Sequence, residues 1–172
     1  KRGNAEAQCR LGACYRDGDG VAEDLARAAR WFGKAAEQGH AEGQHNLGWA
    51  YDIGDGVTED KEEAARWYRK AADQGYALAQ FYLGVSYRDG DGVPVDPVES
   101  AAWYMKAAEQ GNAAAQHNLG CCYDVGEGVE EDKAKAAELY RKAAEQDYGP
   151  AQYNLAVSYR DGDGVPLDKA EM

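Results

Sequence analysis

The sequence has 172 residues, 44% of them hydrophobic, and a formal net charge of −12 at pH 7. That acidic surplus argues against nucleic acid as a partner, because neutralising phosphates requires an excess of Lys and Arg, and it favours solubility or a basic partner. No apolar run approaches the roughly 20 residues of a membrane span, so we expect no membrane insertion in this segment.

The chain repeats itself every 36 residues. We divide it into four full units, about 3–38, 39–74, 75–110 and 111–146, and a partial fifth at 147–172. Self-similarity at this period indicates one domain built as a solenoid of stacked repeats. The series that define it are Leu11, Leu47, Leu83, Leu119 and Leu155; Tyr15, Tyr51, Tyr87, Tyr123 and Tyr159; and Gln8, Gln44, Gln80, Gln116 and Gln152.

Each unit begins with a predicted helix. In the first unit it runs from about Ala5 to Tyr15, and Leu11 and Tyr15 lie on one helical face. The helix ends where Gly18 and Gly20 supply backbone conformations that other residues avoid. We expect the same helix in every unit.

A second helix follows in each unit, and an aspartate is predicted to cap its first turn. The sequence Asp96-Pro97-Val98-Glu99 places Pro at the first helical position, and Asp60-Lys61-Glu62-Glu63 has the pattern of a capping box. The aspartates are Asp24, Asp60, Asp96, Asp132 and Asp168.

The second helix is predicted to bury Ala29, Phe32 and Ala36 and their equivalents, and to end at a glycine. Many inward alanines allow close approach of the helix axes. The sequence therefore predicts an all-α fold, an α-solenoid of antiparallel helix hairpins forming a curved superhelix. The helix-ending glycines are Gly39, Gly75 and Gly111.

The turn between the two helices carries a recurring acidic motif, RDGDGV, at positions 16–21, 88–93 and 160–165. A calcium-binding EF-hand loop needs an oxygen ligand at position 5 and a Glu at position 12. Counting from Asp17, these positions hold Val21 and Ala28. The even units keep the glycines but replace the first Asp with Ile53 or Val125. We interpret the motif as a turn and not as a metal site.

The unit follows the pattern A-x-A-Q-x-x-L-G-x-x-Y-x-x-G-x-G-V-x-x-D-x-x-x-A-A-x-W-Y-x-K-A-A-x-Q-G, with the central element present as LGACY, LGWAY, LGVSY and LGCCY. This pattern resembles the Sel-1-like repeat, a relative of the tetratricopeptide repeat, over essentially the whole chain. The resemblance implies stacked helix hairpins that bind other proteins as a scaffold or adaptor. It also implies that the first helices line the concave surface.

Three positions depart from the repeat pattern. The fifth unit has Ala156 in place of Gly, and the fourth has Asp147 for the helix-ending Gly and Leu139 for Trp. These departures affect local packing and leave the fold unchanged.

A second period of two units is also present. One position alternates in charge along the array, and this alternation predicts attraction between neighbouring turns, worth at most ~1 kcal/mol for exposed pairs. The residues at this position are Arg16, Asp52, Arg88, Asp124 and Arg160.

Catalysis is not expected from this sequence. The histidines His40, His45 and His117 are the only ordinary general bases near neutral pH, and His45 and His117 lie two units apart, too far to share a metal ion. Cys14 and Cys122 stand where other units have Ala or Ser, which indicates small core residues. No P-loop or nucleophile–base pair is present. We predict a protein that is not an enzyme, with no cofactor, metal or catalytic residue.

The variable face of the first helices is the candidate binding surface. Its positions offer aromatic anchors and an Asn row able to hold a peptide backbone. The alternative is that some of these residues pack between units, above all Trp49 and Phe81. The candidate site residues are His45, Asn46, Trp49, Phe81, Tyr82, Val85, His117, Asn118, Tyr153 and Asn154.

Two function classes remain open. The first is an interaction scaffold that binds a partner protein or extended peptide on the concave face. The second is a structural spacer or assembly subunit without a dedicated groove. Because Lys1-Arg2-Gly3 aligns with the end of a second helix and the chain stops soon after Asp168, we expect an excerpt of a longer array or one covered by another subunit. The sequence carries no signal that assigns the protein to a cellular compartment.

Overall fold

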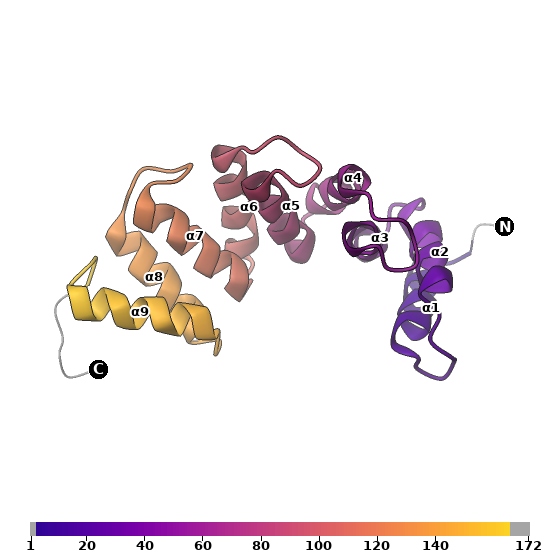
Figure 1. Cartoon of the computed structure of the whole chain (residues 1–172). Helices are drawn as coiled ribbons and strands as arrows, with labels where there is room; N and C mark the ends of the chain where they lie inside the picture. Colours follow the sequence, from indigo (N-terminus) through magenta and orange to yellow (C-terminus); the bar gives the residue numbers. More distant parts are fainter. Residues whose placement is uncertain (1–2, 166–172) are drawn as a thin grey trace. The chain divides into compact units, whose positions relative to one another are not determined.

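A computed structural model describes residues 3–165, and these residues form helices joined by turns, with no strand among them (Figure 1). The chain divides into two compact units, 1–95 and 96–172. Lys1, Arg2 and the predicted cap Asp168 lie outside the described residues. The first unit holds α1 (Ala5–Asp17), α2 (Leu25–Ala36), α3 (Ala41–Ile53), α4 (Lys61–Ala72) and α5 (Ala77–Asp89), and the second holds α6 (Pro97–Glu109), α7 (Ala113–Val125), α8 (Lys133–Ala144) and α9 (Gly149–Asp161).

Within each unit, every helix packs against the next one along the chain. In the first unit α1 packs on α2, α2 on α3, α3 on α4 and α4 on α5, and α1 also contacts α3. In the second unit the pairs are α6 with α7, α7 with α8, and α8 with α9. The fold is the all-α solenoid of helical repeats that the sequence predicts. At positions 3–165, no helix combines the length and the apolar character that crossing a bilayer requires.

Aspartate caps start the second helices as predicted. The Asp24 side chain accepts from the Arg27 N–H at 2.9 Å, and the Asp60 side chain accepts from the Glu63 N–H at 3.0 Å. The capping-box interpretation of Asp60 was half wrong, however, because its own N–H donates to the carbonyl of Tyr51 at 2.9 Å and not to Glu63. This bond connects the start of the second helix to the end of the first.

The first helices end at left-handed glycines, two residues later than predicted. Helix α1 continues through Asp17, and Gly18 follows with φ 71°. After the second helices, Gly39 has φ 85°, and Asp147 adopts φ 60° at the equivalent position in the fourth repeat. The turn therefore keeps its conformation with an Asp, one of the few side-chain residues that tolerate it.

The core lies between the two helices of each repeat. Ala29, Phe32 and Ala36 are buried as predicted. The recurring Gly of the central element has a steric role, because a Cβ built on Gly12 would come within 2.7 Å of the Phe32 ring. Gly48 and Gly120 lie in the same way against Tyr68 and Tyr140. The Gly thus lets an aromatic ring reach the backbone of the first helix.

The recurring glutamines connect three consecutive helices. The Gln44 side chain on α3 donates to the carbonyl of Ala36 at the end of α2, at 3.2 Å. Gln74, just after α4, donates in turn to the Gln44 side chain at 2.7 Å. The same pair of bonds recurs in the second unit through Gln116 and Gln146. The glutamine series therefore serves packing between repeats.

The turn-to-turn attraction predicted from the alternating charges was wrong. Arg16 forms its ion pair with the adjacent Asp17, at 2.7 Å. Asp52 accepts from Lys61 at 2.9 Å and from the Tyr68 hydroxyl at 3.2 Å, both in its own repeat. Arg16 thus pairs with its neighbour in the sequence, and Asp52 pairs with residues of the helix that packs against its own, α4.

Candidate functional site

His45, a candidate binding residue, is a packing residue in the structure. It is 7% exposed. Its ring centroid lies 5.7 Å from that of Tyr68 in its own repeat, and 5.3 and 5.5 Å from those of Tyr76 and Tyr82 in the next. His45 therefore fills the junction between two repeats and offers a partner almost no surface.

Burial also removes the positive charge of His45. Desolvation, with a smaller contribution from Arg16, lowers the pKa of His45 to about 4. Its Nδ1 atom has no hydrogen-bond partner in the part of the chain that the structure describes. The ring is neutral at physiological pH and acts as a flat, mostly apolar spacer.

Three half-buried aromatic side chains lie in contact on α3 and α5, and we call Trp49, Phe81 and Tyr82 the aromatic patch. The ring centroids of Trp49 and Tyr82 are 5.1 Å apart, as are those of Phe81 and Tyr82. Tyr82 also stacks on the buried Tyr68 at 5.4 Å. Tyr82 thus forms the base of the patch, and Trp49 and Phe81 flank it.

In the second unit, polar side chains stand at the positions equivalent to Phe81 and Tyr82, which hold His117 and Asn118. The His117 Nδ1 atom lies 3.1 Å from the Asn118 side-chain oxygen, and its Nε2 atom lies 3.1 Å from the Asn154 amide nitrogen. Burial lowers the pKa of His117 as well. Tyr153, by contrast, is 71% exposed. The Asn row is thus already engaged within the protein, since Asn46 also donates to the Cys9 sulfur at 3.7 Å.

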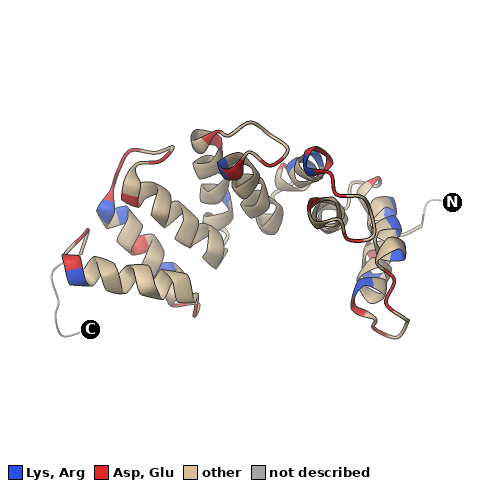
Figure 2. Ribbon diagram, in the orientation of Figure 1, with Lys and Arg blue, Asp and Glu red and all other residues tan. Residues whose placement is uncertain are grey.

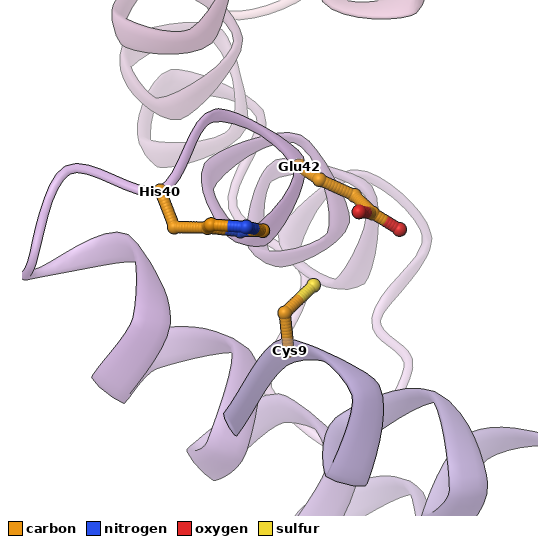
Figure 3. Close-up of side chains that lie close together, drawn as sticks. All are labelled: Cys9, His40 and Glu42. Carbon is orange, nitrogen blue, oxygen red and sulfur yellow. The ribbon is translucent and has the colours of Figure 1, made fainter. Parts of the chain in front are cut away.

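The structure brings together three potential metal ligands that the sequence analysis did not connect. One ligand atom each from Cys9, His40 and Glu42 lies within 4.8 Å of the other two (Figure 3). Cys9 is 2% exposed, His40 is half-buried and Glu42 is exposed. The signal that could have revealed this cluster is the repeat register, because the equivalent positions of Cys9 and His40 in the next pair of repeats, His45 and Tyr76, pack with their ring centroids 5.3 Å apart.

A pocket of about 290 Å³ lies in the second unit where the fourth repeat departs from the pattern. It is lined by residues of α6, α7 and α8, among them Met105, Leu119, Tyr123, Leu139 and Lys142. Leu139 stands where the other full repeats have Trp, so the pocket marks the volume of a missing indole.

The repeats of this chain match a known protein family. The sequence profile described as "Sel1 repeat" matches residues 5–40, 41–76, 77–112, 113–148 and 149–171. The chain belongs to the Sel1 repeat family. The profile places each Sel1 repeat two residues later than our division and keeps its period. Sel1 repeat proteins are generally protein–protein interaction scaffolds, and the family is generally non-enzymatic.

Solved structures of several bacterial proteins resemble the chain over most of its length. A protective antigen of uropathogenic Escherichia coli shares 43% identity with a TM-score of 0.94, over 98% of this chain and 36% of that protein. A Sel1 repeat protein from Oxalobacter formigenes shares 40% identity with a TM-score of 0.89, over 96% of this chain and 68% of its own. An immunity protein of Pseudomonas aeruginosa is 28% identical with a TM-score of 0.61, over 91% of this chain and 58% of its own. No curated protein sequence gave a significant match.

Proposed function

We propose that this chain is an interaction scaffold that binds a partner protein or extended peptide through the first-helix face of its first unit, centred on the aromatic patch. The observation that carries the proposal is the contact of Trp49 with Tyr82, whose ring centroids are 5.1 Å apart and whose side chains are half-buried and so still partly exposed to solvent. Trp and Tyr are enriched among the residues that contribute most to binding energy at protein interfaces. Val85, one helical turn from the patch, is half-buried as well.

The structure of the patch suits partner binding. Tyr82 is held in place by stacking on Tyr68, so a partner that covers it loses little additional side-chain entropy. Trp49 and Phe81 flank this fixed ring and can enclose an apolar side chain of the partner. His45 no longer belongs to the proposed surface, because it is buried beneath the patch.

Charge favours a basic partner. Figure 2 shows Asp and Glu along the turns that follow α1, α3 and α7, and the net charge of the chain is −12. Such a field speeds the encounter with a positively charged segment and weakens with added salt. The partner class we propose is therefore a basic protein segment with at least one apolar anchor.

The test is affinity capture followed by a binding titration. The purified chain captures partners from a lysate of its source cells, and the dissociation constant of each purified partner is then measured against Trp49→Ala/Phe81→Ala. We expect this double variant to weaken binding at least tenfold, while Val98→Ala, which alters a residue that is 65% exposed on a second helix, binds as the unaltered chain does. If the unaltered chain, the double variant and Val98→Ala all bound the partner with equal affinity and kept their helicity, the aromatic patch would not be the binding surface.

The structural spacer is the second candidate function, and the burial of His45 between repeats favours it. In that function the variable positions of the first helices serve packing between Sel1 repeats. The double variant would then lose stability and keep its partners. Circular dichroism and the titration together separate the two functions.

A further inference from the structure

We propose that Cys9, His40 and Glu42 form a binding site for a divalent transition-metal ion of the zinc class. The three side chains come from different places in the chain: the middle of α1, the residue that caps α3, and the first turn of α3 (Figure 3). One ligand atom from each lies within 4.8 Å of the other two. This proposal differs from the expectation, drawn from the sequence, that the protein holds no metal.

The donor atoms fit zinc chemistry. Thiolate sulfur, imidazole nitrogen and carboxylate oxygen are the ligands that Zn²⁺ uses in proteins, and tetrahedral coordination places sulfur and nitrogen about 3.5 Å apart. Closing the present separation needs a movement of about 1 Å, which rotation of the exposed Glu42 and half-buried His40 side chains can supply. A water molecule from the exposed side of the cluster would complete the coordination.

Binding of the ion is coupled to one proton. Cysteine coordinates metal ions as the thiolate, so the Cys9 thiol must lose its proton when the ion binds. Formation of the metal–sulfur bond breaks the S–H bond and releases the proton to solvent. Thiolate and carboxylate then balance the two positive charges of the ion. Affinity consequently falls as the pH is lowered.

His40 must give up one hydrogen bond when the metal binds. Its Nδ1 atom accepts from the Gly43 N–H at 3.1 Å and caps α3. A metal on either ring nitrogen ends this bond, because Nδ1 then becomes the ligand or carries the ring proton. The loss of one cap is small against the binding free energy of a metal held by three protein ligands. The anionic ligands also offset the positive end of the α3 dipole.

The solenoid geometry does not require ligands at these positions. Three other sets of residues hold the equivalent positions in the sequence, and none of them combines three metal-ligating residues. Their combination is therefore a feature of this junction and not of the fold. The equivalent residues are His45, Tyr76 and Leu78; Phe81, Asn112 and Ala114; and His117, Tyr148 and Pro150.

The site would tie consecutive Sel1 repeats together. Cys9 belongs to the first repeat and Glu42 to the second, and α1 contacts α3 directly. A bound ion therefore resists separation of the two repeats and stabilises the folded chain as any ligand of the native state does.

The test is titration of the 172-residue chain with Co²⁺, whose thiolate complexes give an intense charge-transfer band, followed by displacement with Zn²⁺. We expect a saturable band at one equivalent, one proton released per ion, and a higher Tm with Zn²⁺. Cys9→Ser should abolish the band. His40→Asn should weaken binding at least tenfold and keep the cap, because Asn112 caps α7 at the equivalent position.

Cys14→Ser is the matched control, since Cys14 lies on the same helix outside the cluster. The control should bind Co²⁺ as the unaltered chain does. A chain that shows no saturable band overturns the proposal. So does a band that persists in Cys9→Ser, or full affinity in His40→Asn. Metal held only by surface carboxylates gives no thiolate band and counts as a negative result.

Discussion

Gly56 in the turn after α3 lies directly against the carbonyl group of Leu25, the first residue of α2 in the preceding repeat. A Cβ built on Gly56 would collide with that carbonyl oxygen. The motif that resembles a calcium loop thus places a glycine where two repeats meet backbone to backbone. The other pairs of this kind are Gly92 with Lys61, Gly128 with Pro97, and Gly164 with Lys133.

Substitution of this glycine should destabilise the chain more than substitution of its counterpart in the first turn. Gly20 and Gly56 have φ of 71° and 72°, but a Cβ on Gly20 meets nothing within 4 Å. Gly20→Ala should cost about 1 kcal/mol of backbone strain, and Gly56→Ala about 2 kcal/mol more because of the collision. Urea unfolding measures both. If both variants lost the same free energy of unfolding, the backbone at the contact between repeats would have shifted to accommodate the new Cβ without a measurable loss of stability.

His45 should make stability depend on pH. Its pKa is lowered from 6.5 to about 4 in the folded chain, so the unfolded chain binds the proton more readily. The contribution is fully present above pH 6.5 and is lost between pH 6.5 and pH 4, a change of ~3 kcal/mol. His45→Phe should remove this part of the pH dependence, since Phe81 occupies the equivalent position. Parallel curves of unfolding free energy against pH for both proteins would contradict the assignment.

Leu139→Trp should raise stability by filling the pocket in the fourth repeat. In the second repeat the Lys70 ammonium lies 3.6 Å from the centroid of the Trp67 ring, whereas Lys142, at the equivalent position, pairs with Glu138 at 2.6 Å. The added indole should bury apolar area and recover the cation–π contact, for a gain of about 1–2 kcal/mol. Thermal unfolding measures the gain, with Trp67→Leu as the reverse exchange. A lower Tm for Leu139→Trp would mean that the indole ring does not fit into the pocket.

Periodicity was enough to predict most of the fold. The helices, their aspartate caps and the burial of Phe32 follow from spacing alone, because local capping and a single apolar stripe determine them. The Arg16 ion pair was mispredicted for a physical reason. A partner one residue away along the chain, Asp17, competes successfully with a partner in the next turn.

The candidate site was less accessible to sequence reasoning. A first helix in a solenoid has two buried faces, one against its own second helix and one against the next repeat. Periodicity within one repeat identifies only the first of these faces. For that reason His45 was assigned to the open surface. The cluster of Cys9, His40 and Glu42 needs the register of two repeats at once, and no motif within either repeat indicates it.

Hydrogen exchange on the chain with and without its captured partner tests the scaffold proposal most directly. If the aromatic patch is the docking surface, the partner should slow exchange in α3 and α5, around Trp49 and Phe81, and this protection should disappear in Trp49→Ala/Phe81→Ala. Protection confined to the second helices α2 and α4, and unchanged in the double variant, would contradict the account.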